Sequence, residues 1–584
     1  MCGIWGGIYK NTQEITKTEQ FSAKMHESLK HRGPDDMGQY VDEKLFIANT
    51  RLSILDLANG KQPYSKDGVE VVQNGEIYNF VELQKELTEN HGVEFKTNCD
   101  TEVLLHGYLT WGKDFVNKLN GMFAVAIYDS RINKLFLFRD RIGVKPFYYY
   151  KDEEKVLFAS EIKTILAYGV DKKPNLQALN MFLSFNYIPT PLTAFENVHC
   201  VNPGEYLEID FDLNIEKTTW WDATKFNDDC KDSEEEVMKK VMSTLDEASR
   251  IRMRSDVEVG AFLSGGIDSS TVVGLSSKHT DKQLRTFSIG FEDKRFDESA
   301  DAEFTAKRFN TKHINKTSQP DIINLWQKFI YHCDQPHGDV SFMPTYQVSS
   351  LASEYLKVVL TGDGADELFA GYGKYKVLEN SDVDMAEYFN GINLLSDEEK
   401  EKLCVGELKE LAKSSSYEDF IAPFVAKTKH LGKINQALAF DVFYLLSGNN
   451  MVKPDRMGMA KSIEARNPFL DYRLVEYALT LPGEMKLQDG ETKYILKKAT
   501  TPLVDARITY KPKQMFTVPI GEWFKGDLKD YLVEILTSDS FKSRGLFDQD
   551  RVETMIDEHI AGEANYTREL RALISIEIWF RTFF

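Results

Sequence analysis

The 584-residue sequence has few cysteines and no long apolar run. Its six cysteines lie far apart, without a CxxC pair or a zinc-ligand spacing, so neither a disulfide framework nor a zinc site is indicated and a reducing compartment fits best. No stretch approaches the roughly 20 apolar residues of a membrane span. The N-terminus also lacks the basic start and apolar core of a secretory signal. We therefore expect a cytoplasmic protein.

Basic residues are also in short supply, because 71 Lys and Arg against 91 Asp and Glu give a net charge of -20. Such a charge repels the phosphates of nucleic acid and anionic membrane surfaces, so we expect neither as a partner. The remaining composition is ordinary, with 42% hydrophobic and 28% charged residues, which excludes disorder of the whole chain. At roughly 150 residues per domain, the length indicates more than one domain.

The first part of the chain mixes strand and helix patterns. Short alternating or apolar runs predict strands at 44–48, 69–73, 122–128, 134–138, 146–150 and 155–159, in antiparallel sheets. Helical spacing appears at 80–90 and 101–111. A polar, acidic stretch at 222–232 precedes Ser233 and Glu236, a capping-box pair that opens a helix. We place the domain boundary there, which gives domains at 1–225 and 226–584.

After that helix the pattern becomes strand, glycine-rich loop, helix. Apolar strands are predicted at 257–263, 285–291 and 357–360, the first leading through SGGIDSS to a helix from Thr271. Alternation of this kind predicts a parallel sheet with binding loops at the carboxyl ends of its strands. Beyond about Ser381 the sequence is almost entirely helical in period.

The loop SGGIDSS, at 264–270, has the residues expected of a phosphate site. Gly265 and Gly266 let the backbone approach a phosphate, while loop amides and the helix N-terminus supply partial positive charge. The order is not that of a P-loop, and the plainer interpretation is a tight strand-to-helix turn. The full motif resembles the pyrophosphate loop of N-type ATP pyrophosphatases, enzymes that cleave ATP between its α- and β-phosphates.

A second loop, TGDGADE at 361–367, gathers Asp363, Asp366 and Glu367 at a glycine-containing turn after another apolar strand. Carboxylates beside a triphosphate indicate a hard cation such as Mg²⁺ between them. A solvated acidic turn is the alternative. The position of this loop after a second strand of the same sheet favours metal binding.

Cys2 is the candidate nucleophile. Removal of Met1 would place a thiol and a free α-amino group, of pKa roughly 7.7 to 8.0, on one residue. The amine would then be a built-in base, as in enzymes with an N-terminal threonine. The alternative is a cysteine without a role.

Four polar clusters between strands could build a pocket around it: HRGPDD (31–36), RLSIL (51–55), NGEIYN (74–79) and CDTE (99–102). Arg51 suits an α-carboxylate, while Glu76 and Asp100 suit an α-ammonium group. The Asn74 side-chain amide and the Gly75 backbone amide suit a developing oxyanion. Taken singly, each cluster is equally consistent with a surface turn.

Together, MCGIWG, HRGPDD, RLSIL and NGEIYN resemble the class II glutamine amidotransferase domain. Joined to the pyrophosphatase motifs, they make nearly the whole chain resemble the glutamine-hydrolysing asparagine synthetase family. The resemblance implies an N-terminal nucleophile domain of the α+β class, with antiparallel sheets sandwiched by helices. An α/β parallel-sheet ATP pyrophosphatase domain with a helical C-terminal part would follow it.

The resemblance also implies roles for individual residues. Cys2, Asn74, Gly75, Asp363 and Lys493 would be catalytic. Glutamine would be bound by Arg51, Ser53, Ile54, Asn74, Gly75, Glu76 and Asp100. ATP would be bound by Leu263, Ser264, Gly265, Gly266, Asp268, Ser269, Ile289, Thr361 and Gly362, and Mg²⁺ by Asp268 and Asp366. The segment KPDRMGMAKSIEARNPFLD, at 453–471, is similar to a helix and turn of the family.

The implied reaction is amidation of aspartate through β-aspartyl-AMP, with ammonia from glutamine crossing an internal passage. The substrates would be glutamine, aspartate and ATP, with Mg²⁺, and a homodimer is compatible with the resemblance. Some positions depart from the family pattern: Gln335, Asp363, Pro454 and Asn467. They leave open a second enzymatic hypothesis, in which the acceptor is a uronic-acid sugar or a cell-envelope precursor. A non-enzymatic nucleotide sensor is the third hypothesis, and it predicts ATP binding without turnover.

Overall fold

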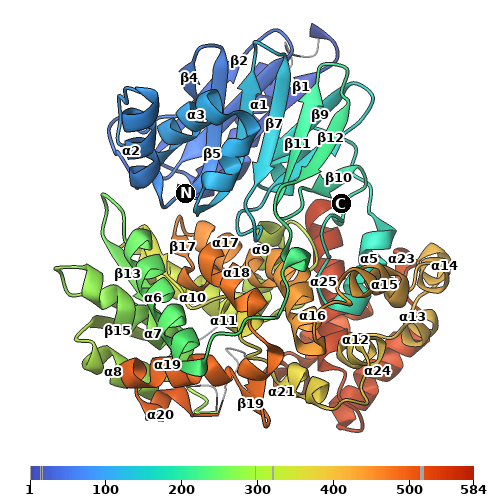
Figure 1. Cartoon of the computed structure of the whole chain (residues 1–584). Coiled ribbons are helices and arrows are strands. Elements are labelled where there is room, and N and C mark those ends of the chain that lie inside the picture. The colour runs from blue at the N-terminus through green and yellow to red at the C-terminus, as the bar shows by residue number, and fades with distance from the viewer. Residues whose placement is uncertain (1, 13–14, 16–17, 296, 319–320, 513–518) are drawn as a thin grey trace.

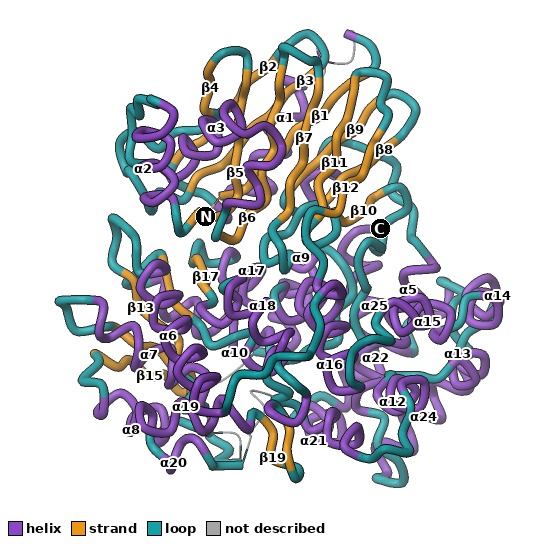
Figure 2. Tube along the Cα trace, viewed as in Figure 1, coloured by secondary structure: helices purple, strands orange, loops and turns teal. Residues whose placement is uncertain are grey.

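Two stacked parts form the molecule, and they meet where β1 begins and α25 ends (Figure 1). The computed structural model describes residues 2–12, 15, 18–295, 297–318, 321–512 and 519–584. We call the segment from β1 to β12 the N-terminal part and the segment from α6 to α25 the C-terminal part. Figure 2 shows that strands dominate the first and helices the second.

The N-terminal part contains two six-stranded sheets whose ladders are antiparallel, as the sequence predicts. The first has the order β10-β8-β9-β1-β3-β2 and the second β12-β11-β7-β6-β5-β4. Their strands are β1 (Cys2–Tyr9), β2 (Asp36–Val41), β3 (Leu45–Arg51), β4 (Tyr64–Lys66), β5 (Val69–Ile77), β6 (Gly121–Asp129), β7 (Lys134–Arg139), β8 (Tyr148–Lys151), β9 (Lys155–Ala159), β10 (Val198–Cys200), β11 (Glu205–Asp210) and β12 (Ile215–Thr219).

Helices cover both outer faces of this sandwich. Along β1, Ile4 and Ile8 point into the core between the sheets, while Trp5 and Tyr9 point to the opposite core, as the period of two in a strand requires. That outer core includes Met25 of α1 (Thr18–Leu29). The other outer face packs against α2 (Phe80–His91) and α3 (Asp100–Trp111). The predicted α+β fold with helices on both sides is confirmed.

Two short helices, α4 (Ile162–Ala167) and α5 (Leu176–Phe185), precede β10. Helix α5 lies among the helices of the C-terminal part (Figure 1), where the Lys400 ammonium donates to Asn180 at 3.0 Å. The predicted boundary at 225/226 falls between β12 and α6 (Glu234–Arg252). Ser233 and Glu236 form the predicted capping box at the start of α6.

The C-terminal part is built on a five-stranded parallel sheet with the order β15-β14-β13-β16-β17. Its strands are β13 (Val259–Phe262), β14 (Arg285–Phe291), β15 (Lys312–Ser318), β16 (Val358–Leu360) and β17 (Glu464–Arg466). The parallel sheet was predicted, but several details were not, among them β15 and the hairpin at 487–492. Helix α7 begins at Ile267 rather than Thr271, and β17 interrupts a region that we expected to be almost entirely helical.

A search for apolar runs does not reveal β17, because two of its three residues are charged. Glu464 and Arg466 are both buried, and they pair with each other at 2.6 Å. The ladder to β16 runs from Val358 opposite Glu464 to Leu360 opposite Arg466. A paired, buried charge therefore takes the place of the apolar residues that usually mark an inner strand.

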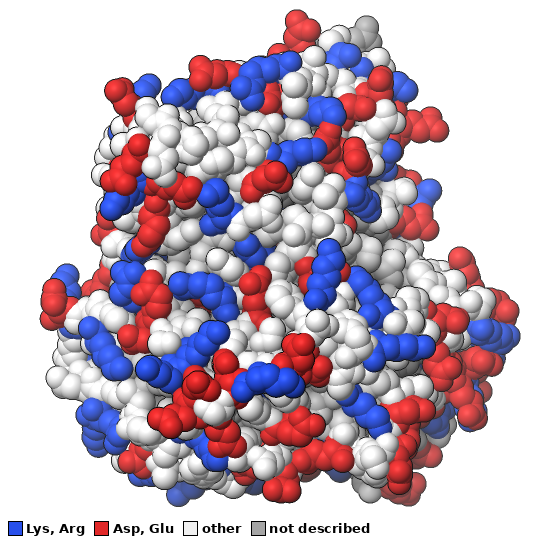
Figure 3. Space-filling model, in the orientation of Figure 1, with Lys and Arg blue, Asp and Glu red and all other residues white. Residues whose placement is uncertain are grey.

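The rest of the C-terminal part is helical, apart from the hairpin of β18 (Leu487–Gln488) and β19 (Glu491–Thr492). Among the described residues, no helix combines the length and apolarity needed to cross a bilayer. The face drawn in Figure 3 carries side chains of both charge signs, interspersed. Further helices are α8 (Ser299–Arg308), α9 (Ile322–Cys333), α10 (Phe342–Ser353), α11 (Ala365–Leu368), α12 (Met385–Ile392), α13 (Asp397–Leu403), α14 (Gly406–Ser414), α15 (Tyr417–Lys427), α16 (Lys433–Phe440), α17 (Val452–Met459), α18 (Tyr472–Thr480), α19 (Tyr494–Val504), α20 (Ala506–Thr509), α21 (Ile520–Lys525), α22 (Lys529–Leu536), α23 (Asp539–Ser543), α24 (Gln549–Ala561) and α25 (Thr567–Phe583).

Candidate functional site

Cys2 begins β1 and is 6% exposed. It lies opposite Arg51 in the ladder between β1 and β3, and the Leu52 backbone hydrogen-bonds the thiol. Burial raises the pKa of the Cys2 thiol. The thiol is therefore neutral at physiological pH, and a base must remove its proton before it can attack.

The turn after β3 holds the residues predicted to bind glutamine. The Arg51 guanidinium donates to the backbone carbonyls of 55–57, the closest at 2.8 Å. The Ser53 amide donates to the Asp35 carboxylate at 2.7 Å, and Ile54 is buried beside it. The structure thus brings Arg51, Ser53 and Ile54 together next to Cys2.

Glu76 and Asp100, the predicted ligands of an ammonium group, are both buried. Asp100 accepts from the Gln73 side chain and from the Ile77 amide, each at 2.9 Å. Arg466, which belongs to the C-terminal part, lies 3.5 Å from Glu76. Burial raises the pKa of both carboxyl groups, and Glu464, followed by Asp100, raises that of Glu76 further. Such a pair of buried acids favours binding of a cation between or beside them.

Asn74 and Gly75, the predicted oxyanion donors, lie in β5. The Asn74 amide donates to Ser160 at 3.2 Å, and Ser160 accepts from the Ile4 amide at 3.0 Å, which links β5 to β1 two residues after Cys2. Gly75 has φ of 151°, and a Cβ there would lie 2.0 Å from the Met122 carbonyl oxygen. Only glycine fits this close contact.

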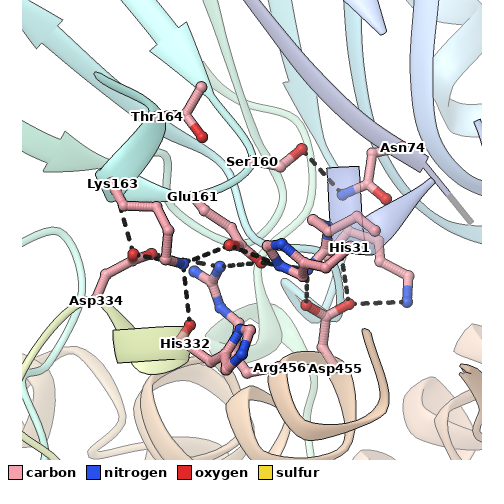
Figure 4. A network of polar contacts seen from close by, with 12 residues as sticks. His31, Asn74, Ser160, Glu161, Lys163, Thr164, His332, Asp334, Asp455 and Arg456 are labelled. Atoms are coloured by element: carbon pink, nitrogen blue, oxygen red, sulfur yellow. Dashed lines mark hydrogen bonds and ion pairs between the residues drawn. The ribbon is translucent and has the colours of Figure 1, made fainter. Parts of the chain in front are cut away.

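A buried network of charged side chains joins the two parts beside this site (Figure 4). The Arg32 guanidinium donates to both oxygens of Asp455, at 2.8 and 3.0 Å, and to Glu161 at 2.9 Å. Its Nε donates to the Cys2 carbonyl at 3.2 Å. Lys145 lies 3.3 Å from the same Asp455. The backbone of the candidate nucleophile is thereby tied to a carboxylate of the C-terminal part.

The network continues away from Cys2 through a second arginine. Arg456 lies 2.9 Å from Glu161 and 3.4 Å from Asp334. Lys163 lies 2.8 Å from Asp334, whose carboxylate also accepts from the amides at 162–163. His332 stands beside them, and burial, with Lys163 nearby, lowers its pKa to about 2. His332 is therefore neutral, so the charges next to it are those of Lys163 and Asp334.

Helix α17 carries residues of both sites. Asp455 and Arg456 face the N-terminal part, whereas Lys453 lines the cavity of the C-terminal part and lies 3.9 Å from Asp363. One short helix thus contacts the Cys2 site through Arg32 and the TGDGADE loop through Lys453.

The SGGIDSS loop turns from β13 into α7, at the carboxyl edge of the parallel sheet. Gly265 has φ of 76°, and a Cβ there would lie 2.8 Å from the Ala302 amide, so it packs closely against α8. Gly266 caps α7, and the hydroxyls of Ser264 and Ser269 lie 3.1 Å apart. The predicted ATP ligands that line one cavity here are Leu263, Ser264, Gly266, Asp268, Ser269, Ile289, Thr361 and Gly362. Gly265 does not line this cavity.

Lys493 brings the two loops together. Its ammonium lies 2.6 Å from Asp268 and 2.8 Å from Asp366, and its backbone has a left-handed φ of 56° at the start of α19. Gly362 packs so closely on the other loop that a Cβ would lie 2.7 Å from the Ser269 amide. Although burial alone would lower it, the two carboxylates raise the pKa of Lys493. The lysine is a fixed positive charge at this point.

The donor set fits Mg²⁺ only with help from a ligand. Among the described residues, no group of three or more His, Cys, Asp and Glu side chains could hold a metal ion. Mg²⁺ is commonly held by one or two carboxylates together with substrate phosphates and water. Asp268 and Asp366 supply two carboxylates of the right chemistry, so the residues fit a metal that arrives with a triphosphate.

Glu367, the third acid of the loop, has a different setting. It is 1% exposed, 2.6 Å from the Tyr372 hydroxyl, and bonded to the Asn450 amide. Burial, with Asp366 nearby, raises the pKa of Glu367 to about 7. Asp363 instead accepts from the Thr361 hydroxyl at 2.8 Å, and the Asn467 amide donates to that hydroxyl at 2.7 Å.

Sequence patterns did not single out the network in Figure 4. Arg32, Asp455 and Arg456 lie in motifs that we noted without giving these residues a role, HRGPDD and KPDRMGM. Glu161 and Asp334 carry no local signal, because their partners are far away in sequence: Arg32 is 129 residues from Glu161 and 423 from Asp455.

Comparison with known proteins finds two family models that match different segments of the chain. A family model described as Asparagine synthase matches residues 240–581, and one described as Glutamine amidotransferase domain matches residues 1–221. Asparagine synthetase [glutamine-hydrolyzing] 1 of Bacillus subtilis is 33% identical, over 99% of this chain and 96% of that protein. A putative asparagine synthetase [glutamine-hydrolyzing] 2 of Methanocaldococcus jannaschii is 37% identical, over 79% and 98%. Amidase chry2 of Gibberella zeae is 27% identical, over 91% and 89%. The segment matched at 1–221 contains Cys2, and the segment matched at 240–581 contains Lys493.

Proposed function

Since this chain belongs to the family of glutamine-hydrolysing asparagine synthetases, a family of ATP-dependent ligases, we propose that its acceptor is aspartate and that ATP activates the acceptor as β-aspartyl-AMP. A carboxylate is a poor electrophile because its charge repels nucleophiles. Adenylation replaces that charge with a good leaving group, so ammonia can then form the amide.

In the N-terminal part, Cys2 attacks the side-chain amide of glutamine. The α-amino group freed by removal of Met1 takes the thiol proton, which overcomes the pKa raised by burial. Arg51 binds the α-carboxylate of glutamine, and Glu76 with Asp100 binds its α-ammonium group. Asn74 and Gly75 donate to the oxyanion of the tetrahedral intermediate.

Ammonia then passes between the parts without meeting bulk water, where most of it would be protonated. A small cavity of about 10 Å³, enough for about one water-sized molecule, lies between the parts on the route that we propose. Both parts line it, with Met122 and Ile142 on one side and Asn467 and Leu470 on the other. Asn467 in turn contacts Thr361 of the TGDGADE loop at 2.7 Å.

In the C-terminal part, the SGGIDSS amides bind the phosphates that leave as pyrophosphate. Lys493 stabilises the negative charge that develops on the leaving pyrophosphate as the carboxylate attacks the α-phosphate. Mg²⁺, held by Asp268 and Asp366, would neutralise phosphate charge. Asp363 stands 3.9 Å from Lys453 and completes the proposed catalytic set.

The observation that carries the proposal is the contact of Lys493 with Asp268 and Asp366, 2.6 and 2.8 Å away on the two loops. The test is to incubate the protein with glutamine, Mg²⁺-ATP and aspartate and to identify the products by mass spectrometry. We expect asparagine, AMP and pyrophosphate in equal amounts. ADP with orthophosphate as the nucleotide products would contradict the proposed cleavage.

The second candidate keeps both half-reactions and changes the acceptor to a uronic-acid sugar or a cell-envelope precursor. Of the sequence departures behind it, Gln335 is 8% exposed and accepts from the Ala194 amide at 3.2 Å, away from the cavity. Asn467 lies closer to the chemistry through Thr361. Intact glutaminase activity with no asparagine in the same incubation would favour this candidate.

A further inference from the structure

The cavity at the nucleotide loops has a second wall that the proposed ATP ligands do not use. Its volume, about 1510 Å³, exceeds the range of roughly 300–1,000 Å³ typical of small-molecule sites. The second wall includes Asp339, just before α10, Lys453 of α17 and Arg571 of α25. All three are charged, and none belongs to the SGGIDSS or TGDGADE loop.

Arg571 is a positive charge without a partner in the described residues. Among the residues that the structure describes, none holds its guanidinium by a hydrogen bond or an ion pair within 4.0 Å, and its Nε is buried without an acceptor from them. Burial lowers the pKa of Arg571 to about 10, so the group remains charged at neutral pH. An unpaired, partly buried guanidinium facing a cavity is suited to pair with an anionic ligand, because such a pair satisfies its hydrogen-bond donors.

Asp339 is the corresponding negative charge. Its carboxylate accepts from the Ser341 amide at 2.8 Å but forms no ion pair with any described residue. Lys453 lowers the pKa of Asp339 against the effect of burial, so the carboxylate is ionised. The charge of Asp339 raises the pKa of Arg571 against the effect of burial, yet the two side chains form no hydrogen bond or ion pair with each other.

Arg571 and Asp339 carry opposite charges, line one cavity and do not pair with each other, so together they complement a zwitterion. We propose that Arg571 and Asp339 form the acceptor subsite, binding the α-carboxylate and the α-ammonium group of a free α-amino acid. Lys453, beside Asp363, then guides the side-chain carboxylate toward the reacting phosphate. The subsite rests on the proposed function, and it favours an amino acid over a sugar acid, which offers no ammonium group to Asp339.

The experiment pairs protein variants with acceptor analogues that lack one group each. Succinate is aspartate without its ammonium group, and β-alanine is aspartate without its α-carboxylate. The assay is aspartate-dependent pyrophosphate release from Mg²⁺-ATP by the full chain, with the analogues added as competing ligands. Glutaminase activity, which depends on the other site, reports that each variant is folded.

We expect Arg571→Met to raise the KM for aspartate by about 10- to 100-fold, the effect of losing one charge-assisted pair. The inhibition constant of succinate should rise equally and that of β-alanine should not change. Asp339→Asn should weaken aspartate and β-alanine but not succinate. Arg568→Met is the matched control, because Arg568 lines the same cavity but is exposed, and its KM for aspartate should stay within twofold of the wild type.

The subsite is wrong if Arg571→Met changes the KM for aspartate less than twofold, or if it weakens β-alanine as much as succinate. An equal effect of Arg568→Met would also overturn it, by indicating general attraction rather than a subsite. If the wild type activates no aspartate, the proposed function fails, and calorimetry with aspartate and a non-hydrolysable ATP analogue decides the subsite. Binding that Arg571→Met weakens supports it, and absence of binding overturns it.

Discussion

The substitution Asp455→Asn tests whether the buried network holds the candidate nucleophile in place. Asp455 is 3% exposed and neutralises Arg32, at 2.8 and 3.0 Å, and Lys145, at 3.3 Å. Removing one partner of a buried ion pair typically costs about 3–5 kcal/mol, because the remaining charges are left uncompensated. Asparagine keeps one acceptor oxygen, so we expect the lower end, about 3 kcal/mol.

The same change should affect the two activities differently. Arg32 also donates to the Cys2 carbonyl at 3.2 Å, so its displacement should lower the kcat/KM of glutamine hydrolysis about tenfold or more, the scale of misplacing a reacting group. Synthesis with ammonium salts, which bypasses Cys2, should fall less. The assays are denaturant unfolding, glutaminase kinetics and ammonia-dependent synthesis on the same preparation.

A matched control removes an exposed charge instead. Glu303 pairs with Lys307 at 2.7 Å, with both side chains more than half exposed, so Glu303→Gln should leave the denaturant midpoint close to that of the wild type. If Asp455→Asn is as stable as this control and hydrolyses glutamine at the wild-type rate, the network does not position Cys2.

Other predictions concern single groups. Cys2→Ala should abolish glutamine-dependent asparagine formation, and high ammonium should restore it, increasingly toward alkaline pH; persistent glutamine use would contradict the nucleophile. Asn74→Ala should slow glutamine hydrolysis by about 10²- to 10³-fold in stopped-flow or steady-state assays, and an unchanged rate would exclude its oxyanion role. Asp366→Asn should remove synthesis but spare glutaminase activity, and retained synthesis would refute the metal role. The pKa of Glu367 is raised from 4.5 to about 7, so between these pH values its carboxyl group is protonated in the folded state and ionised in the unfolded state. The folded state therefore loses about 3 kcal/mol of stability as pH rises through this interval. Glu367→Gln should remove that loss in unfolding experiments between pH 5 and 8, and a pH profile parallel to the wild type would contradict it.

Local signals in the sequence were sufficient where a short segment determines its own structure. The strand expected at 155–159 is β9, and the capping box at Ser233 opens α6. The turn from a strand to a helix through the SGGIDSS loop was also recognisable, because its glycines and hydroxyls lie within seven residues. Strand β17 was not, because its charged residues lack an apolar pattern and its ladder partner, β16, is far away in the sequence.

The residues of the candidate sites also differ in whether a local sequence motif marks them. Residues in compact motifs, such as Asp268 and Asp366, could be proposed as site residues from the sequence, and the structure places both beside Lys493. Arg571 and Asp339 could not be identified, because each is an isolated charge in an ordinary helix or loop. Their significance comes from facing one cavity, and the chain separates them by more than 200 residues.

Helix α17 has a consequence for exchanging parts between relatives. Asp455 and Arg456 must match Arg32 and Glu161 on one side, while Lys453 must match Asp363 on the other. In a chimera that joins the N-terminal part of one relative to the C-terminal part of another, the charged partners across the interface therefore come from different proteins. Grafts that carry α17 together with its arginine and glutamate partners should assemble, whereas grafts cut between them would bury unmatched charges. At this boundary, the paired residues must therefore be exchanged together, whichever domain they belong to.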